Sequence, residues 1–306
     1  MRIHCDAHNF PFDAKTNPML TILFDGVAYG MLLFILAVGL AVTMGLMNFI
    51  NLAHGAFAML GGYVAVVFTQ RMGLPFLLCL PLAFIATAVL GAVLERTIYR
   101  PMYRKTHLEQ VLFSIGLCFM AMAAADFFMG AQQQVMQLPA WLQGRWEWGD
   151  GMLGAGHYRL FIVVVCIILA VLLQYVLSQT RYGSRLRASL DDPRVASGLG
   201  INTNAVFALT FAVGSGLAGL GGALGVEVLG LDPTFPFKFM VYFLIVVAVG
   251  GTSSVTGPLL AALLLGVADV AGKYYIPKMG AFMVYLLMIA VLLWRPHGLF
   301  VRKGGR

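Results

Sequence analysis

The titratable residues within the apolar part of the chain are few and scattered. Four of them lie inside apolar segments: His54, Asp126, Glu227 and Asp269. Such residues are costly in a membrane and are functional candidates by default. For Asp126 and Glu227, which approach the outer ends of their segments, we favour a structural role. Asp269 has Lys273 four residues on, which predicts an ion pair on one helix face.

No cluster of His, Asp and Glu has catalytic or metal-ligand spacing at one depth of these segments. The four cysteines also show no paired spacing, so we expect neither a disulfide framework nor a zinc site. We therefore predict that the chain is not an enzyme and binds no metal.

Polar and glycine residues instead gather at two places in otherwise apolar sequence. The first is Asn48–Tyr63, which contains two amides, an imidazole and three glycines, and the second is Gly250–Pro258. Two interrupted apolar segments, one in each half, indicate the working centre of a transporter. The predicted substrate path or gate comprises Asn48, Asn51, His54, Gly55, Gly61, Gly62, Gly250, Gly251, Thr252, Ser253, Ser254 and Gly257. We interpret His54 as a hydrogen-bonded packing residue rather than a catalytic base.

Two apparent nucleotide motifs fail on context. Gly214–Gly219 matches G-x-G-x-x-G but lies inside an apolar helix with no preceding strand, so close helix packing is the better interpretation. Gly272-Lys273 lacks the upstream glycine of a P-loop, and Tyr274 replaces the required hydroxyl residue. We expect no ATP binding by this chain.

Composition sets the class of protein that must position these residues. Of the 306 residues, 60% are hydrophobic and 11% are charged, against about 25% charged in soluble domains. Several apolar runs are long enough to span a bilayer. The sequence predicts an all-α, polytopic integral membrane bundle with eight or nine transmembrane segments and broken or re-entrant helices.

The expected spans follow the apolar runs, with the count left open by a possible re-entrant pair. The runs near 239–249 and 259–271 are too short to cross alone as regular helices. Residues 130–158 form the longest polar excursion, whose Trp141, Trp146, Trp148 and Tyr158 suit the membrane interface. The expected runs are 21–44, 51–70, 76–95, 111–129, 160–177, 205–229, 239–249, 259–271 and 281–294.

Basic residues cluster in three short segments, near 96–105, 181–194 and 295–306. The positive-inside rule places all three in the cytoplasm, and with them the C-terminus. Nine crossings would then put the N-terminus outside, and eight would put it inside.

The segment 181–202 is the most specific feature outside the spans. Asp192 is a good helix N-cap, Pro193 fits the first helical position, and Gly198 or Gly200 can end the short helix. Leu190, Val195, Leu199 and Ile201 supply apolar anchors. Such a helix suits docking into a groove on a partner, and a loop resting on the lipid surface is the alternative.

With these motifs together, the chain resembles a permease of a branched-chain amino acid ABC importer, of the LivH type. The resemblance covers about residues 22 to 300 and rests on Asn51–Ala56 with Gly61–Tyr63, on the 182–201 loop and on Gly250–Pro258. It implies two cytoplasmic ATPase subunits, which would bind ATP and Mg, a second homologous permease and a periplasmic binding protein. It also implies a coupling helix at Asp192–Ile201. The implied ATPase-coupling residues are Arg185, Arg187, Asp192, Pro193, Leu199, Gly200 and Ile201.

The resemblance therefore implies a non-catalytic subunit, with no cofactor of its own, in a bacterial inner membrane. We expect a polar tail over 1–20, a transmembrane permease domain over 21–295 with its coupling loop at 181–202, and a basic cytoplasmic tail over 296–306. The hydroxyl-rich 253–256 segment departs from the family pattern, so the alternative is a permease of the same family for urea, short amides or other amino acids, which related permeases carry. An ion-driven carrier or channel acting alone is a further alternative.

Overall fold

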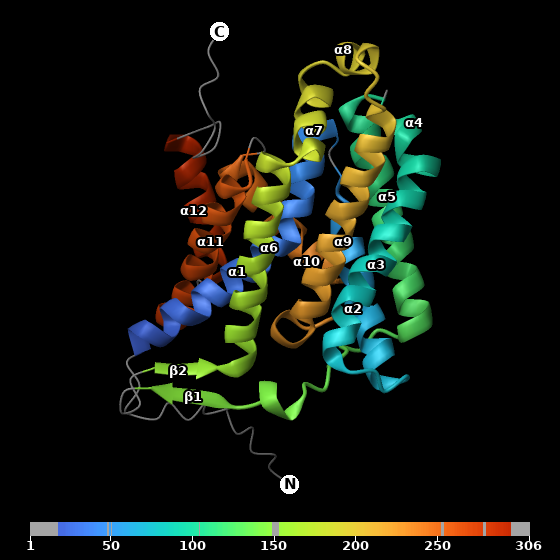
Figure 1. The fold of residues 1–306 in the computed structure, drawn as a ribbon. Helices are drawn as coiled ribbons and strands as arrows, with labels where there is room; N and C mark the ends of the chain where they lie inside the picture. The colour runs from blue at the N-terminus through green and yellow to red at the C-terminus, as the bar shows by residue number, and fades with distance from the viewer. Residues whose placement is uncertain are drawn as a thin grey trace.

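The protein is a bundle of helices, as the sequence predicts (Figure 1). The computed structural model describes residues 18–47, 49, 51–103, 105–148, 153–251, 254–277 and 280–294. The predicted gate residues Asn48, Thr252 and Ser253, most of the N-terminal tail and the basic C-terminal tail lie outside these ranges. The one sheet in the described part is a two-stranded hairpin.

Long helices form the body of the bundle, and short helices and strands connect them. The long helices are α1 (Pro18–Met47), α2 (His54–Gln70), α3 (Phe76–Leu94), α5 (His107–Met129), α6 (His157–Gln179), α9 (Thr203–Leu229), α10 (Phe235–Gly250), α11 (Thr256–Tyr275) and α12 (Gly280–Trp294). The short elements are the π-turn η1 (Glu95–Tyr99), α4 (Arg100–Met102), the 3-10 turn η2 (Ala140–Leu142), β1 (Arg145–Trp148), β2 (Leu153–Gly156), α7 (Arg181–Asp191) and α8 (Pro193–Gly198).

Six helical stretches of the described chain are long and apolar enough to cross a membrane. They are 19–45, 76–102, 107–129, 157–179, 203–229 and 256–275. The expectation that the run near 259–271 is too short was wrong, because α11 extends through the polar residues at both of its ends to 20 residues. α10, with 16 residues, stays short as expected.

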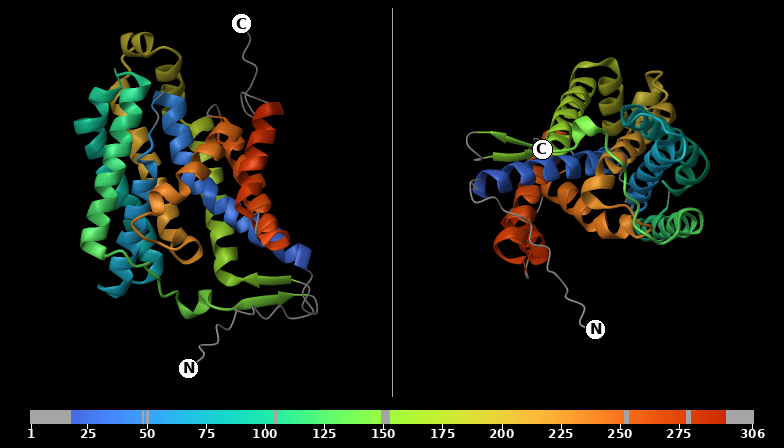
Figure 2. Two further views of the ribbon diagram at one scale, coloured as in Figure 1. Left: turned by 180° about the vertical axis from the view of Figure 1, so that it is seen from behind. Right: turned by 90° about the horizontal axis from the view of Figure 1, so that it is seen from below.

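The direction of the chain at its two ends decides the parity of the crossings. α1 begins at the end of the bundle that carries the β1–β2 hairpin, and α12 finishes at the opposite end, which also carries α7 and α8 (Figures 1 and 2). An odd number of crossings is needed for this arrangement. Eight crossings do not fit it, and the count of nine stays a prediction.

α1 runs through the middle of the molecule and supplies the centre of the core. Its residues 32–38 are almost fully buried, because α9, α10, α11 and α6 all pack around it. Cys79, Cys118 and Cys166 are free and buried, so they act as small core residues.

The glycines of α9 permit the closest helix contacts in the bundle. A Cβ atom at Gly222 would lie 1.8 Å from the backbone oxygen of Ala58 in α2, and one at Gly61 would lie 2.2 Å from the oxygen of Gly219. Only glycine allows two backbones to approach so closely in a membrane helix pair. The G-x-G-x-x-G pattern is therefore a packing surface, as predicted.

The segment before α6 is more ordered than its polar composition suggests. β1 and β2 pair antiparallel, with Arg145 opposite Gly156 and Trp148 opposite Leu153. Tyr158 does not face the membrane interface, contrary to expectation. Its ring is buried and its hydroxyl donates to the Leu224 carbonyl at 2.7 Å, because a buried phenol needs an acceptor.

Candidate functional site

The helical structure is interrupted between α1 and α2, and the chain then returns to the middle of α1. α1 ends at Met47 and α2 begins at His54. The His54 ring nevertheless touches α1 at Leu36, eleven residues before the end of that helix. At 1.5 Å per residue, the chain has come back by about 16 Å before the second helix begins. Among the described residues between the two helices, Phe49, Asn51 and Ala53 are buried, as irregular backbone within a membrane protein must be.

Asn51 fixes this stretch from within the protein. Its side chain is 1% exposed, and Oδ1 accepts hydrogen bonds from the Ala53 N–H and from the Tyr99 hydroxyl, each at 3.1 Å. The Leu52 N–H donates to Ser114 Oγ at 3.2 Å. Both partners come from other elements, η1 and α5. The contacts satisfy polar groups that the missing helix turns would leave unpaired.

His54 ties three helices together at the start of α2. The ring is 2% exposed, and Nε2 lies 2.9 Å from the Leu36 carbonyl oxygen, so Nε2 donates there. The ring packs perpendicular to that of Phe243 in α10, with ring centroids 6.3 Å apart. These contacts agree with a hydrogen-bonded packing role. Gly55, next in the chain, packs against the Pro236 backbone at the start of α10.

The predicted glycines of α2 face helices rather than an open channel. Gly61 meets the α9 backbone, and Gly62 lies under the Leu231 side chain. Both are buried. They set how closely α2 can approach α9, so any gating movement of α2 must change this contact.

The second break joins α10 to α11. Gly250 and Gly251 end α10, and the Gly251 N–H donates to the Val247 carbonyl at 2.8 Å. Ser254 is exposed and its Oγ accepts from the N–H of the buried Gly257 at 3.3 Å. Gly250 packs directly on the Pro258 backbone. The two breaks are thus linked through α10, whose Phe243 touches His54 seven residues before Gly250.

An apolar cavity of about 510 Å³ adjoins the first break, between α2, α3 and α5. Its walls include Phe57, Leu90 and Leu117, and no charged side chain lines it. The hydroxyl of Tyr63 is buried at this cavity without a hydrogen-bond partner in the described residues. The cavity suits an apolar group and offers nothing to a charged one.

The predicted coupling segment is a pair of helices at the end of the bundle opposite the hairpin (Figure 1). α7 is amphipathic, with Leu186 and Ser189 buried and Arg185 and Arg187 exposed. Arg187 donates to the Leu177 carbonyl at the end of α6. α7 is also joined to α9, because the hydroxyls of Tyr182 and Thr210 lie 2.6 Å apart. Burial raises the pKa of Tyr182 above its ordinary value, so this hydroxyl stays protonated at neutral pH.

The caps of α8 are those that the sequence predicts. Asp192 Oδ1 accepts from the N–H groups of Arg194 at 2.8 Å and Val195 at 3.1 Å, and Pro193 stands at the first helical position. Gly200 has a φ of +84° and follows the C-cap Leu199. Its N–H donates to the Ser197 carbonyl, and that of Ile201 donates to Ala196, which completes a Schellman motif.

α8 presents a small apolar face to its surroundings. Val195 and Leu199, four residues apart, are 60% and 75% exposed, while Ala196 is buried against the rest of the fold. A rigid, capped helix with this face can dock in a groove of another protein.

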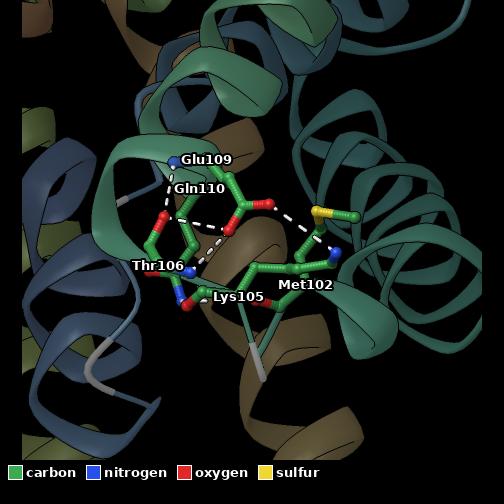
Figure 3. Close-up of polar contacts among 5 residues, drawn as sticks. All are labelled: Met102, Lys105, Thr106, Glu109 and Gln110. Atoms are coloured by element: carbon green, nitrogen blue, oxygen red, sulfur yellow. Dashed lines mark hydrogen bonds and ion pairs between the residues drawn. The ribbon is translucent and has the colours of Figure 1, made fainter.

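The turn between α4 and α5 shares this end of the bundle and is held by side-chain contacts (Figure 3). Thr106 and Glu109 form a capping box, and Lys105 lies 3.6 Å from the Glu109 carboxylate. The Gln110 amide donates to the carbonyls of Met102 at 3.3 Å and Lys105 at 3.2 Å. The turn is therefore fixed relative to α5 beside α7 and α8.

Tyr99 and Ser114 are the residues of this site that sequence reasoning missed. Tyr99 lies 48 positions from its partner Asn51, and Ser114 lies 62 positions from its partner Leu52, and nothing local marks these residues as neighbours. The predicted ion pair of Asp269 and Lys273 is present, at 2.5 Å. Within the described part of the chain, no group of three His, Cys, Asp or Glu residues can hold a metal ion.

Comparison with known proteins gives one family. The family model described as the permease component of the branched-chain amino acid transport system matches residues 22–292. The high-affinity branched-chain amino acid transport system permease protein BraD of Pseudomonas aeruginosa is 28% identical over 293 residues, covering 92% of this chain and 95% of its own. LivH of Escherichia coli K12 is also 28% identical, covering 92% and 94%. LivM of the same organism is 25% identical, covering 88% and 68%. No solved structure gives a match.

Proposed function

Since the chain belongs to the family of branched-chain amino acid transport permeases, we propose that it is the membrane-spanning permease subunit of an ATP-driven importer of branched-chain amino acids. The observation that carries the proposal is the family match across nearly all of the membrane bundle. The capped helix α8, exposed at one end of that bundle, supports it independently.

The proposed mechanism starts at α8. ATP binding would close the dimer of partner ATPase subunits, and the groove that holds α8 would move with it. The Tyr182–Thr210 and Arg187–Leu177 contacts join α7 to α9 and α6, so a push on α8 reaches both helices. α9 packs on α2 through backbone contacts that cannot compress, and α2 would shift at its break near His54.

The assembly that this role needs contains four further kinds of component. They are two cytoplasmic ATP-binding subunits, a second homologous permease, a periplasmic substrate-binding protein and the lipid bilayer. The similarity of the chain to both LivH-named and LivM-named permeases supports pairing with a relative of its own fold. ATP and Mg would bind the ATPase subunits, and this chain would bind no cofactor.

The proposed location is the bacterial inner membrane, with α7, α8 and the C-terminus in the cytoplasm. The exposed Arg96 and Arg100 support this orientation, because they lie at the same end as α8. The proposed domain limits remain 1–20, 21–295 and 296–306.

The experiment is purification of the tagged chain from its native membrane, followed by uptake in proteoliposomes. Recovery of a second permease and ATPase subunits, with ATP-dependent uptake of labelled leucine, is the expected result. Uptake of urea or short amides in place of leucine would show that the transported substrate is not a branched-chain amino acid. Transport by this chain alone, independent of any ATPase, would refute the importer role.

A further inference from the structure

A mixed-charge cavity lies at the end of the bundle that carries the hairpin. Its volume is about 220 Å³, and α1, α6, α9 and α11 form its walls. Asp25 of α1 is ion-paired with Arg159 of α6, and Asp269 of α11 is ion-paired with Lys273. Two cations and two carboxylates from three helices therefore face one space.

A second cavity, of about 420 Å³, continues the first toward the segment before α6. The two cavities share Asp25, Arg159 and Val228, and Glu227 lines the larger one. Glu227 has no ion-pair or hydrogen-bond partner among the residues that the structure describes. A carboxylate at the end of a membrane helix, beside a cavity that also holds an arginine, is free to bind a cation from outside.

Arg159 and Lys273 have hydrogen-bond donors that their ion pairs do not use. A guanidinium carries five N–H donors and an ammonium three, and one carboxylate uses only some of them. The side chains of Arg159 and Lys273 are 41% and 55% exposed, while Asp269 is 1% exposed. Tyr242 also donates to Asp269 at 3.4 Å, so that carboxylate is held by the fold. The unused donors therefore remain open to a ligand.

Apart from the charged residues and Tyr29, whose ring lies under the Lys273 ammonium, the wall of the smaller cavity is apolar. Ile162, Val228 and Val270 line it together with Ala28. A ligand that fits must carry a negative group, a positive group and a short apolar part.

We infer that these joined cavities bind a free amino acid zwitterion before it reaches the breaks between α1 and α2 and between α10 and α11. Arg159 takes the α-carboxylate, Glu227 takes the α-ammonium group, and the apolar side chain lies toward Ile162 and Val270. This inference rests on the proposed function, and it adds a binding step at the outer end of the permease. The ethanolamine headgroup of a phospholipid shares the zwitterionic chemistry, so the test must separate the two sources.

The test measures equilibrium binding of labelled leucine to the purified complex in nanodiscs made of phosphatidylcholine. We expect saturable binding that weakens at least tenfold in Arg159→Gln and in Glu227→Gln, because each removes a charge-assisted hydrogen bond. Lys238→Gln is the matched control, since Lys238 is ion-paired with Asp232 at the same end of the bundle and lines neither cavity. Its binding constant should not change.

A charge swap separates binding from structure. Asp25→Arg combined with Arg159→Asp keeps an ion pair between α1 and α6 but exchanges the positions of the charges. Loss of leucine binding in a swap variant that retains the wild-type melting temperature supports the site. Wild-type binding in the swap, or in both single variants, overturns it.

Two further measurements distinguish the remaining outcomes. If adding phosphatidylethanolamine to the nanodiscs displaces leucine from the site, the lipid is the occupant and the amino acid proposal fails. ATP-driven uptake with the binding protein is measured in parallel. Normal leucine uptake by every variant overturns the cavity site and leaves the importer role standing, whereas no leucine uptake by the wild type overturns the proposed substrate as well.

Discussion

Gly200 is the position where a single methyl group tests the coupling role of α8 most directly. Its φ of +84° is in the left-handed region, which costs about 1–2 kcal/mol for a residue with a Cβ atom. No atom lies within 4 Å of the Cβ that alanine would add, so backbone strain is the whole effect. Gly200→Ala should therefore weaken the capped conformation of α8 by about 5- to 30-fold relative to its alternatives.

The assay is the number of leucine molecules taken up per ATP hydrolysed in proteoliposomes. We expect this ratio to fall in Gly200→Ala and to recover in part in Gly200→Asn, since asparagine tolerates the left-handed region. Gly198→Ala is the matched control, because it lies in the same helix, also has open space around it and has no positive φ. Equal ratios for Gly198→Ala and Gly200→Ala would refute the reasoning.

Three further predictions concern stability. Gly222→Ala places a Cβ 1.8 Å from an α2 backbone oxygen, so the free energy of unfolding should fall by about 1–3 kcal/mol or more and the melting temperature should fall with it. Gly116→Ala on α5 is the control, because its Cβ meets no atom and the melting temperature should stay unchanged. Asn51→Leu should lower the free energy of unfolding by about 1–3 kcal/mol, because the buried Tyr99 hydroxyl loses its acceptor. In a double-mutant cycle, adding Tyr99→Phe should recover part of that loss. Strictly additive effects of the two substitutions would contradict the contact. Burial opposes ionisation of Asp232, but hydrogen bonds from the neighbouring lysine and threonine prevail and lower its pKa, so the turn before α10 should keep this stabilisation above the unfolded pKa of about 3.9 and lose it as the pH falls through the folded pKa. Hydrogen exchange of the turn against pH checks this, and an unchanged profile in Asp232→Asn would refute it.

Local sequence was enough for the features that depend on neighbours along the chain. The caps of α8 follow from Asp192, Pro193 and Gly200, since side chains and backbone a few residues apart make all of their contacts. The Asp269–Lys273 pair follows from helical spacing for the same reason. The break before α2 was visible because amides and glycines interrupt an apolar run.

Helix ends were harder to predict, because a helix continues past its apolar run when its polar side chains find partners. α11 runs to Tyr275 although Asp269 and Lys273 fall within it, since these two charges neutralise each other. The hairpin before α6 was missed because its four-residue strands carry too weak a pattern.

The sequence by itself determined a helical membrane bundle, two broken segments and a short capped helix, because hydrophobic length, glycine and capping residues act over short distances. Only the tertiary structure showed that Asn51 is held by Tyr99, that the Leu52 N–H is held by Ser114, and that His54 bonds to Leu36. It alone brought Asp25, Arg159, Glu227 and Lys273 around joined cavities. These residues come from four helices far apart in the chain, and which helix faces which is set by packing that no local pattern encodes.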